Sequence, residues 1–165
     1  MGTRLGTISN STPKAMIPID GIPFISLQLK LLKKKGFNKV VIATGYMGDK
    51  IKSFLKNGSE FGLEIQYSDD GESLLGTGGA IKNALCLLDE HFFVTYGDTL
   101  LPNSFAPLIE SFNGIACMMV YENKNKLDKS NAVFDGANLV YRKKKPDADA
   151  AFIDYGVSLI KSQCF

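Results

Sequence analysis

Stretches with two different hydrophobic periods follow one another along residues 1–121. Phe24, Leu27 and Leu31 recur at helical spacing and are followed by lysines and Gly36, which predicts a helix over residues 24–35. The same criteria predict helices at residues 48–56, from residue 76 to about residue 88, and briefly from about residue 102. Short apolar runs predict strands over residues 40–43, 63–67, 91–96 and 115–121.

This alternation of strands and helices predicts the fold class. A strand, a helix and the next parallel strand form a right-handed crossover, and repeated crossovers build a parallel sheet covered by helices on both faces. We therefore expect an α/β fold with a mostly parallel central sheet. Ligands of such sheets bind beyond the carboxyl ends of the strands, which directs attention to the loops at residues 44–46, 68–79 and 97–98.

The pattern changes after Tyr121. A polar loop at residues 123–130 precedes two short apolar runs on either side of Asp135-Gly136, which predicts a β-hairpin, and residues 151–160 form a last strand-like segment. The sequence contains no repeat, low-complexity tract or linker that would divide it. We therefore expect a single domain over residues 1–165.

Composition narrows the class of protein. With 45% hydrophobic and 22% charged residues, the chain has the composition of an ordinary globular domain, and a net charge of +2 disfavours nucleic acid as the main partner. No apolar run approaches the ~20 residues of a membrane span, and the start lacks a signal-peptide pattern. Three cysteines without a C-x-x-C pair predict core packing in a reducing compartment, so we expect a cytoplasmic protein.

The first polar stretch combines groups that bind phosphate. Gly2 and Arg4 are followed by Lys14, with no room for a helix between Leu5 and Pro18. Backbone N–H groups near a glycine, a forked guanidinium and an ammonium can together bind a polyphosphate. Residue types alone also allow a ragged, solvated N-terminus.

Asp98 directly follows a predicted buried strand and the flexible Gly97. A carboxylate at this position can hold Mg²⁺ together with substrate phosphates, or it can cap the helix that follows. The glycine cluster that begins at Gly76 resembles a dinucleotide fingerprint only superficially, because Ile81 occupies the third glycine position. It predicts instead a helix start whose backbone can approach a planar or anionic ligand.

Groups for nucleophilic catalysis are scarce. The single histidine, His91, precedes an apolar run and is expected to be structural, and there is no G-x-S-x-G motif or cluster of His and Cys. A reaction between two phosphate-bearing substrates needs no base, because the attacking phosphate oxygen is largely ionised near pH 7. Its requirements are cations, Mg²⁺ and alignment.

Together these segments resemble the sugar-phosphate nucleotidyltransferases, also called nucleoside-diphosphate-sugar pyrophosphorylases. Residues 2–5 and 13–19 are similar to the family motifs G-T-R-L and P-K-x-x-x-P-[IVL], and residues 75–80 to its L-G-T-[AG]-G loop. The resemblance covers nearly the whole chain. It implies a Rossmann-like, three-layer α/β sandwich, with a nucleotide-binding half at residues 1–121 and the start of a sugar-binding half at residues 122–165.

The resemblance also implies a reaction and a set of site residues. The reaction is Mg²⁺-dependent and joins an NTP to a sugar 1-phosphate, releasing pyrophosphate. The implied residues are Arg4 and Lys14 for catalysis at the phosphates, Gly2, Thr3, Glu72, Gly76, Thr77 and Gly78 for the nucleotide, Lys143, Asp154 and Gly156 for the sugar phosphate, and Asp98 for the metal.

Two departures from the family pattern concern how much of the family's domain this chain contains. The family begins with a buried strand that would precede Met1, and its second metal carboxylate would lie beyond Phe165. The resemblance therefore implies an internal part of a longer domain, without its first strand and its C-terminal part.

Two other functions stay open from the sequence. One is a noncatalytic regulatory module that binds a sugar nucleotide, and the other is a cytidylyltransferase acting on a phosphorylated alcohol. The presence of Arg4, Lys14 and Asp98 together favours an enzyme, and Asp154 favours a sugar acceptor. The sequence leaves open the NTP base, the sugar phosphate and whether the chain forms a homo-oligomer.

Overall fold

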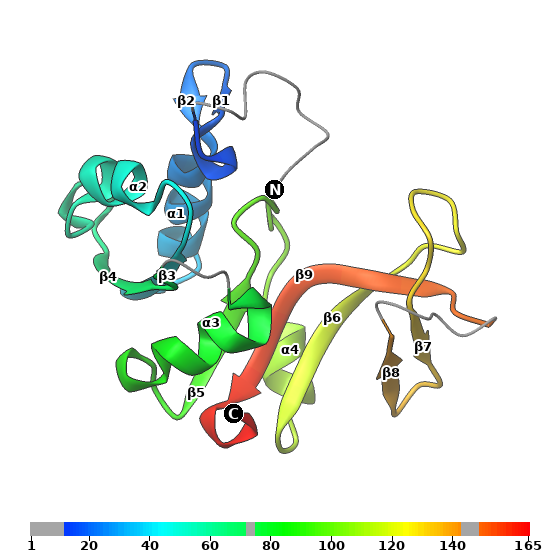
Figure 1. The fold of residues 1–165 in the computed structure, drawn as a ribbon. Helices are drawn as coiled ribbons and strands as arrows, with labels where there is room; N and C mark the ends of the chain where they lie inside the picture. The colour runs from blue at the N-terminus through cyan, green and yellow to red at the C-terminus, as the bar shows by residue number, and fades with distance from the viewer. Residues whose placement is uncertain (1–11, 72–74, 143–148) are drawn as a thin grey trace.

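A computed structural model describes residues 12–71, 75–142 and 149–165 of the chain (Figure 1). Its helices are α1 (Phe24–Lys34), α2 (Gly48–Leu55), α3 (Gly76–Ala84) and α4 (Ala106–Ser111), with short 3₁₀ turns η2 (Lys14–Met16), η3 (Ser59–Phe61), η4 (Leu85–Leu87) and η5 (Ser162–Cys164). Its strands are β1 (Pro18–Ile19), β2 (Ile22–Pro23), β3 (Lys39–Thr44), β4 (Glu64–Asp69), β5 (His91–Thr95), β6 (Ala116–Glu122), β7 (Ala132–Phe134), β8 (Leu139–Tyr141) and β9 (Phe152–Lys161). Every helix and strand expected from the hydrophobic pattern is therefore present in the described part of the chain.

Helix α1 shows how local sequence and packing combine. It ends where Gly36 adopts a φ of +94°, a conformation that glycine reaches at little cost, and the Gly36 N–H donates to the Lys33 carbonyl. Its most buried residues are Ile25, Ser26 and Leu29. The expected stripe through Phe24, Leu27 and Leu31 is only half-buried, because the helix packs on its neighbours through the adjacent face.

The expectation of a mostly parallel central sheet is wrong for the described residues. Only β3 and β4 pair in parallel, from Lys39 opposite Glu64 to Thr44 opposite Asp69. A separate five-stranded sheet contains β5 to β9. In it the long strand β9 lies between β5 and β6 and runs antiparallel to both, and the β7–β8 hairpin joins it at Phe152 (Figure 1). The alternation of helices and strands stops before β9, so the crossover argument did not apply to the strand that organises this sheet.

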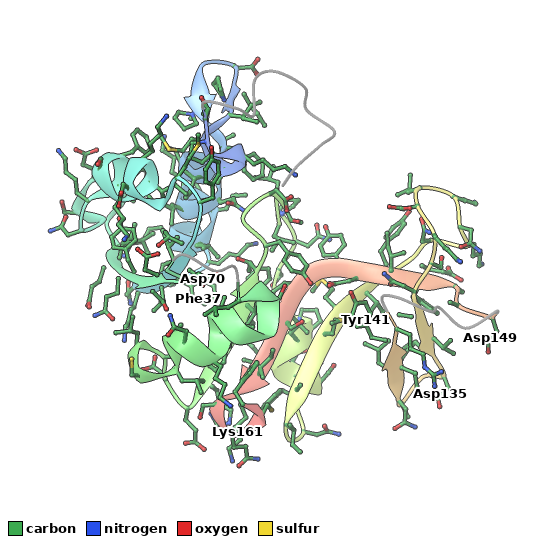
Figure 2. All side chains as sticks on the ribbon, in the orientation of Figure 1. Phe37, Asp70, Asp135, Tyr141, Asp149 and Lys161 are labelled. Carbon is green, nitrogen blue, oxygen red and sulfur yellow. The ribbon has the colours of Figure 1, made fainter. Side chains whose placement is uncertain are left out.

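Among the described residues, two clusters of buried side chains form the core. The first joins α1 and α2 to the parallel pair through Ile25, Leu29, Leu55, Leu63 and Ile65. The second lies under α4 and β9 and contains Leu101, Phe105, Leu108 and Val157. Phe37, labelled in Figure 2, packs against both clusters and makes edge-on ring contacts with Phe93 and Phe105.

The cysteines depart from their expected core positions. Cys86 and Cys164 are exposed, and only Cys117 is half-buried, where burial raises the pKa of its thiol. Their spacing alone could not reveal this, since both exposed cysteines lie on short 3₁₀ turns. None of the helices in the described ranges is both long and apolar enough to cross a membrane.

The parallel pair β3–β4 and the five-stranded sheet that contains β5 and β9 border a cavity of about 450 Å³. Five successive residues of β3 (39–43) and all five of β5 (91–95) line it, together with side chains from α1 and α3. Successive side chains of a strand point to opposite faces, so an uninterrupted run of lining residues means that the backbone edge of each strand faces the cavity. The edges of β3 and β5 therefore approach the same hollow from opposite sides.

Candidate functional site

The structure describes seven of the twelve predicted site residues. Gly2, Thr3, Arg4, Glu72 and Lys143 lie outside the described residues, so their predicted roles stay predictions. The seven described residues are Lys14, Gly76, Thr77, Gly78, Asp98, Asp154 and Gly156.

Asp98 lies in a tight turn at the carboxyl end of β5. The Thr99 N–H donates to the Tyr96 carbonyl at 3.3 Å, which closes the turn around Gly97 and Asp98. Asp98 is exposed. It does not cap the following helix, because α4 begins only at Ala106, whose N–H donates to the Ser104 hydroxyl at 3.1 Å. The capping alternative for Asp98 is therefore wrong.

Asp154 and Gly156 of β9 lie against this turn. The Asp154 carboxylate accepts a hydrogen bond from the Tyr96 hydroxyl at 2.8 Å and another from the Gly156 N–H at 2.8 Å. Gly156 is buried and has a φ of +98°, and a Cβ added there would lie 2.8 Å from Cγ2 of Thr99. Both its backbone conformation and the approach of Thr99 therefore require glycine at this position.

Tyr96 connects the two carboxylates electrostatically. Burial raises the pKa of its phenol, and the hydrogen bond to Asp154 and the negative charges of Asp154 and Asp98 raise it further. Burial also raises the pKa of Tyr141, labelled in Figure 2, and the charge of Asp154 adds to that shift. The negative charges of both carboxylates therefore favour the neutral form of Tyr96.

The glycine-rich start of α3 offers open backbone. Gly76 has a φ of +70°, and a Cβ added at Gly76 or Gly78 would meet no atom within 4 Å. Thr77 between them is exposed. The next turn of α3 and Gly97 line the same cavity, so the start of α3 and the Asp98 turn belong to neighbouring parts of one hollow. This helix N-terminus has the partial positive charge that favours an anionic group.

Lys14 has a different setting. It is exposed on η2, whose next two residues, Ala15 and Met16, pack against the first core cluster. The described contacts therefore fix Lys14 on the α1 side of the molecule. They bring Asp154 and Gly156 to the turn that contains Asp98 through Tyr96 and Thr99, whereas Lys14 and the α3 glycines are placed by separate elements.

The sequence did not single out Gln28, Tyr96 or Thr99. The Gln28 side-chain Nε2 donates to the carbonyls of Tyr96 at 2.8 Å and of Thr99 at 2.7 Å, so α1 holds the turn that contains Asp98. The only signal in the sequence was a glutamine between two leucines on a helix whose other polar residues are mostly lysines. Such a residue is usually solvated, so that signal was weak.

The donor set suits a divalent cation such as Mg²⁺. Mg²⁺ prefers oxygen ligands and is usually held by one or two carboxylates together with substrate phosphates. Asp98 is an exposed carboxylate, and Asp154 keeps acceptor capacity beyond its two hydrogen bonds. Among the described residues no group of three or more His, Cys, Asp or Glu side chains is placed to hold a metal, so the carboxylates fit Mg²⁺ only in company with substrate oxygens.

Comparison with known proteins gives this geometry a context. A family model described as nucleotidyl transferase matches residues 1–149. The D-glycero-alpha-D-manno-heptose 1-phosphate guanylyltransferase of Campylobacter jejuni is 33% identical over 168 residues, which cover 100% of this chain and 74% of that protein. The N-acetylmuramate alpha-1-phosphate uridylyltransferase of Neisseria meningitidis is 33% identical over 115 residues, which cover 69% of this chain and 50% of that protein. The chain thus spans only part of each relative.

Solved structures confirm the α/β class. The crystal structure of HddC from Yersinia pseudotuberculosis has a TM-score of 0.78 and 24% identity to this chain, and the match covers 99% of this chain and 73% of that one. The structure of the same protein complexed with GMP-PN also has a TM-score of 0.78, at 23% identity and with the same coverage. At this identity the likeness extends to the fold alone.

Proposed function

The chain belongs to the nucleotidyl transferase family, and from that premise we propose that it joins an NTP to a sugar 1-phosphate and releases pyrophosphate. The observation that carries the proposal is the placing of two carboxylates at the end of β5. Asp98 lies in the turn that Thr99 closes, and Asp154 on the paired strand β9 accepts a hydrogen bond from the Tyr96 hydroxyl. Two carboxylates and an anion-binding helix start are what a reaction between two phosphate compounds needs.

The proposed reaction balances without a protein base. An oxygen of the sugar phosphate forms a new bond to the α-phosphorus of the NTP, and the bond from that phosphorus to the bridging oxygen of the β-phosphate breaks. The electron pair leaves with pyrophosphate. No proton has to be removed from the attacking oxygen, because a phosphate monoester is largely ionised near pH 7. This agrees with the exposed, edge-on position of His91 against Phe112, where it has a packing role.

Each part of the chain has a proposed task. Gly76, Thr77 and Gly78 would hold the nucleotide through backbone contacts, and Asp154 and the Gly156 backbone would face the sugar phosphate. Lys14, with Arg4 from the N-terminal stretch, would neutralise phosphate charge. This division assigns the nucleotide to residues 1–121 and the acceptor to residues 122–165.

Asp98 would hold Mg²⁺, and the charge of Asp154 on the paired strand β9 would add to the attraction for the cation. When bound, the cation would neutralise phosphate charge and orient the oxygens that react. The chain's own contribution would be to fix the Asp154 carboxylate through its hydrogen bonds from the Tyr96 hydroxyl and the Gly156 N–H.

The test is pyrophosphate release by the purified protein with a panel of NTPs and sugar 1-phosphates. The relatives are named for guanylyl and uridylyl transfer, so the panel includes GTP and UTP as well as dTTP and CTP. The variant Asp98→Asn is expected to lower kcat/KM by at least about 100-fold, because metal coordination contributes several kcal/mol. Asp49→Asn, an exposed aspartate on α2, is the matched control and is expected to change nothing.

Three results would contradict the proposal. Equal turnover in Asp98→Asn and Asp49→Asn would remove the role assigned to Asp98. Tight binding of a nucleotide sugar by calorimetry, with no pyrophosphate released under any pairing of substrates, would indicate a regulatory module. Release only with CTP and a phosphorylated alcohol such as phosphocholine would assign the chain to a different acceptor class.

A further inference from the structure

Gln28 of α1 makes two hydrogen bonds to the turn that contains Asp98. Its amide nitrogen donates to the Tyr96 and Thr99 carbonyls, which lie on either side of Gly97 and Asp98. These partners are 68 and 71 residues away along the chain. The contact is therefore a tertiary clamp between α1 and the turn.

The chemistry of the clamp is specific to a primary amide. A side-chain amide offers two N–H donors from one nitrogen, and here two carbonyl oxygens accept from that nitrogen at 2.7 and 2.8 Å. Leucine would leave both carbonyls without this partner, and an ionised glutamate would place negative oxygen against them. The Tyr96 carbonyl would keep the Thr99 N–H, but the Thr99 carbonyl would lose its Gln28 donor. Burying a carbonyl without a donor costs about 1–3 kcal/mol, so either change would let the turn move.

The turn is constrained on its other side by β9. Thr99 lies so near Gly156 that a Cβ added there would be 2.8 Å from its Cγ2, and the Tyr96 hydroxyl donates to Asp154. Tyr96 thus accepts from Gln28 through its carbonyl and donates to Asp154 through its side chain. A connected path of hydrogen bonds runs from α1 through the Asp98 turn to β9.

A second contact between α1 and the same loop provides an internal comparison. The Lys35 ammonium donates to the Pro102 carbonyl at 3.0 Å and to the Asn103 carbonyl, and lies 4.9 Å from the centre of the Phe105 ring. Lys35 therefore anchors the loop to α1 beyond the Asp98 turn. If the loop needed only attachment, loss of Lys35 would have the same effect as loss of Gln28.

We propose that Gln28 is a positioning residue for nucleotidyl transfer: its amide fixes the Tyr96–Thr99 turn and thereby sets the place of the Asp98 carboxylate relative to Asp154. The inference rests on the proposed function for its catalytic consequence. Its structural part, the control of the turn by Gln28, stands on the hydrogen bonds alone.

The experiment compares Gln28→Leu with Lys35→Met in the full chain. The first readout is amide hydrogen exchange at Thr99, whose N–H closes the turn, and we expect Gln28→Leu to accelerate it at least about 10-fold while Lys35→Met leaves it within about twofold. The second is the affinity for Mn²⁺ in the presence of nucleotide, expected to weaken by about 10-fold in Gln28→Leu only. The third is kcat, expected to fall by about 10–100-fold with KM for the NTP nearly unchanged.

Gln28→Glu provides a variant of the same length with a pH readout. At neutral pH it is expected to behave like Gln28→Leu, because an ionised carboxylate cannot donate. As the pH falls and the carboxyl becomes protonated, it regains one donor, so its kcat relative to wild type should rise. This recovery would not occur if Gln28 only filled space.

The outcomes separate the two proposals. Equal Thr99 exchange and equal Mn²⁺ affinity in the Gln28 and Lys35 variants would overturn the positioning role. A wild-type protein that transfers no nucleotide would overturn the proposed function, while the exchange measurement would still decide whether Gln28 controls the turn. A kcat that falls equally in both variants, or a Gln28→Glu variant without pH-dependent recovery, would also count against positioning.

Discussion

At the scale of single residues, Tyr96 is held from two directions. Its carbonyl accepts from Gln28, and its hydroxyl donates to Asp154. Burial, this hydrogen bond and the nearby carboxylates all disfavour the phenolate, so the pKa of Tyr96 is raised above its ordinary value of about 10. The folded protein therefore keeps a proton on Tyr96 at pH values where the unfolded chain has lost it.

This difference predicts a pH dependence of stability. Because the folded pKa is raised, the contribution of Tyr96 is fully present below about pH 10 and is lost as the pH rises above that value. Tyr96→Phe removes the titration and the hydrogen bond, at an expected cost of about 1 kcal/mol near pH 7. Denaturant unfolding of both proteins should show that the difference in their free energies of unfolding becomes smaller above pH 10. A difference that stays constant up to pH 12 would contradict the prediction.

Gly156 gives a second prediction at this scale. Gly156→Ala forces an L-residue to a φ of +98° and places a Cβ 2.8 Å from Cγ2 of Thr99, so we expect a loss of about 2–4 kcal/mol in the free energy of unfolding. Gly136 has the same φ but open space around it, so Gly136→Ala isolates the backbone strain, about 1 kcal/mol.

Chemical denaturation measures both changes. Thr99→Ser removes the methyl group that the new Cβ would meet first, so it should recover part of the loss in the Gly156→Ala background and none in the Gly136→Ala background. Equal losses for the two glycine substitutions would show that Thr99 does not press on Gly156.

At the scale of elements, α1 contacts both core clusters and the loop after β5. It contributes Ile25 and Leu29 to the first core cluster and Leu32 to the edge of the second. Gln28 and the C-cap residue Lys35 donate hydrogen bonds to the loop after β5. One helix therefore ties the parallel strand pair to the turn that carries Asp98. A change in the packing of α1 should reach the candidate site even though α1 contains none of its predicted residues.

Leu29→Ala tests this role of α1. Leu29 is 2% exposed, and its truncation leaves a cavity in the first cluster, for which we expect a loss of about 2–4 kcal/mol in the free energy of unfolding. Leu127→Ala, at a residue 76% exposed, is the matched control and should stay within about 0.5 kcal/mol of wild type. Urea unfolding followed by circular dichroism compares them, and similar losses in both would mean that α1 is not packed as described.

The elements themselves were predictable, and their pairing was not. Apolar runs and glycine stops located α1, β3 and β5 because those signals are local. Strand β9 was recognised as a strand, but nothing in its own residues states that it lies between β5 and β6. Pairing depends on contacts between distant segments. The antiparallel strand order of the five-stranded sheet therefore had to come from the structure.

The candidate site divides in the same way. Asp98, Asp154 and the α3 glycines could be selected from the sequence because their residue types and motif context point to phosphate and metal chemistry. Gln28 and Thr99 could not, because glutamine on a helix and threonine in a loop are ordinary residues. Their importance lies in the carbonyls and the glycine that they contact, and those contacts exist only in the folded chain.

At the scale of the whole molecule, the two sheets border a cavity with a strand edge on each side. Residues 39–43 of β3 and 91–95 of β5 line it without interruption, and the inner faces of α1 and α3 contribute apolar side chains such as Leu29 and Ala84. A hollow with two strand edges and two apolar helix faces has the hydrogen-bonding and packing surfaces that an extended apolar segment needs.

The last prediction uses this shape. An engineered apolar segment of about six residues, fused to the chain through a flexible linker, is expected to lie between β3 and β5, pair with both strand edges and join the β3–β4 pair to the five-stranded sheet. Burial of several Val and Ile side chains should outweigh the ordering cost by a few kcal/mol, which raises Tm by about 5 °C or more for a chain of this size.

The control is an extension of the same length on the same linker, made of alternating Ser and Lys, whose polar side chains do not suit an apolar cavity. Calorimetry measures Tm, and hydrogen exchange reports whether the edge amides of β3 and β5 become protected. Protection of both edges by the apolar extension alone would establish that the hollow accepts a strand. Equal Tm values for the two extensions, or protection on one edge only, would mean that β3 and β5 are too close or too far apart to share one.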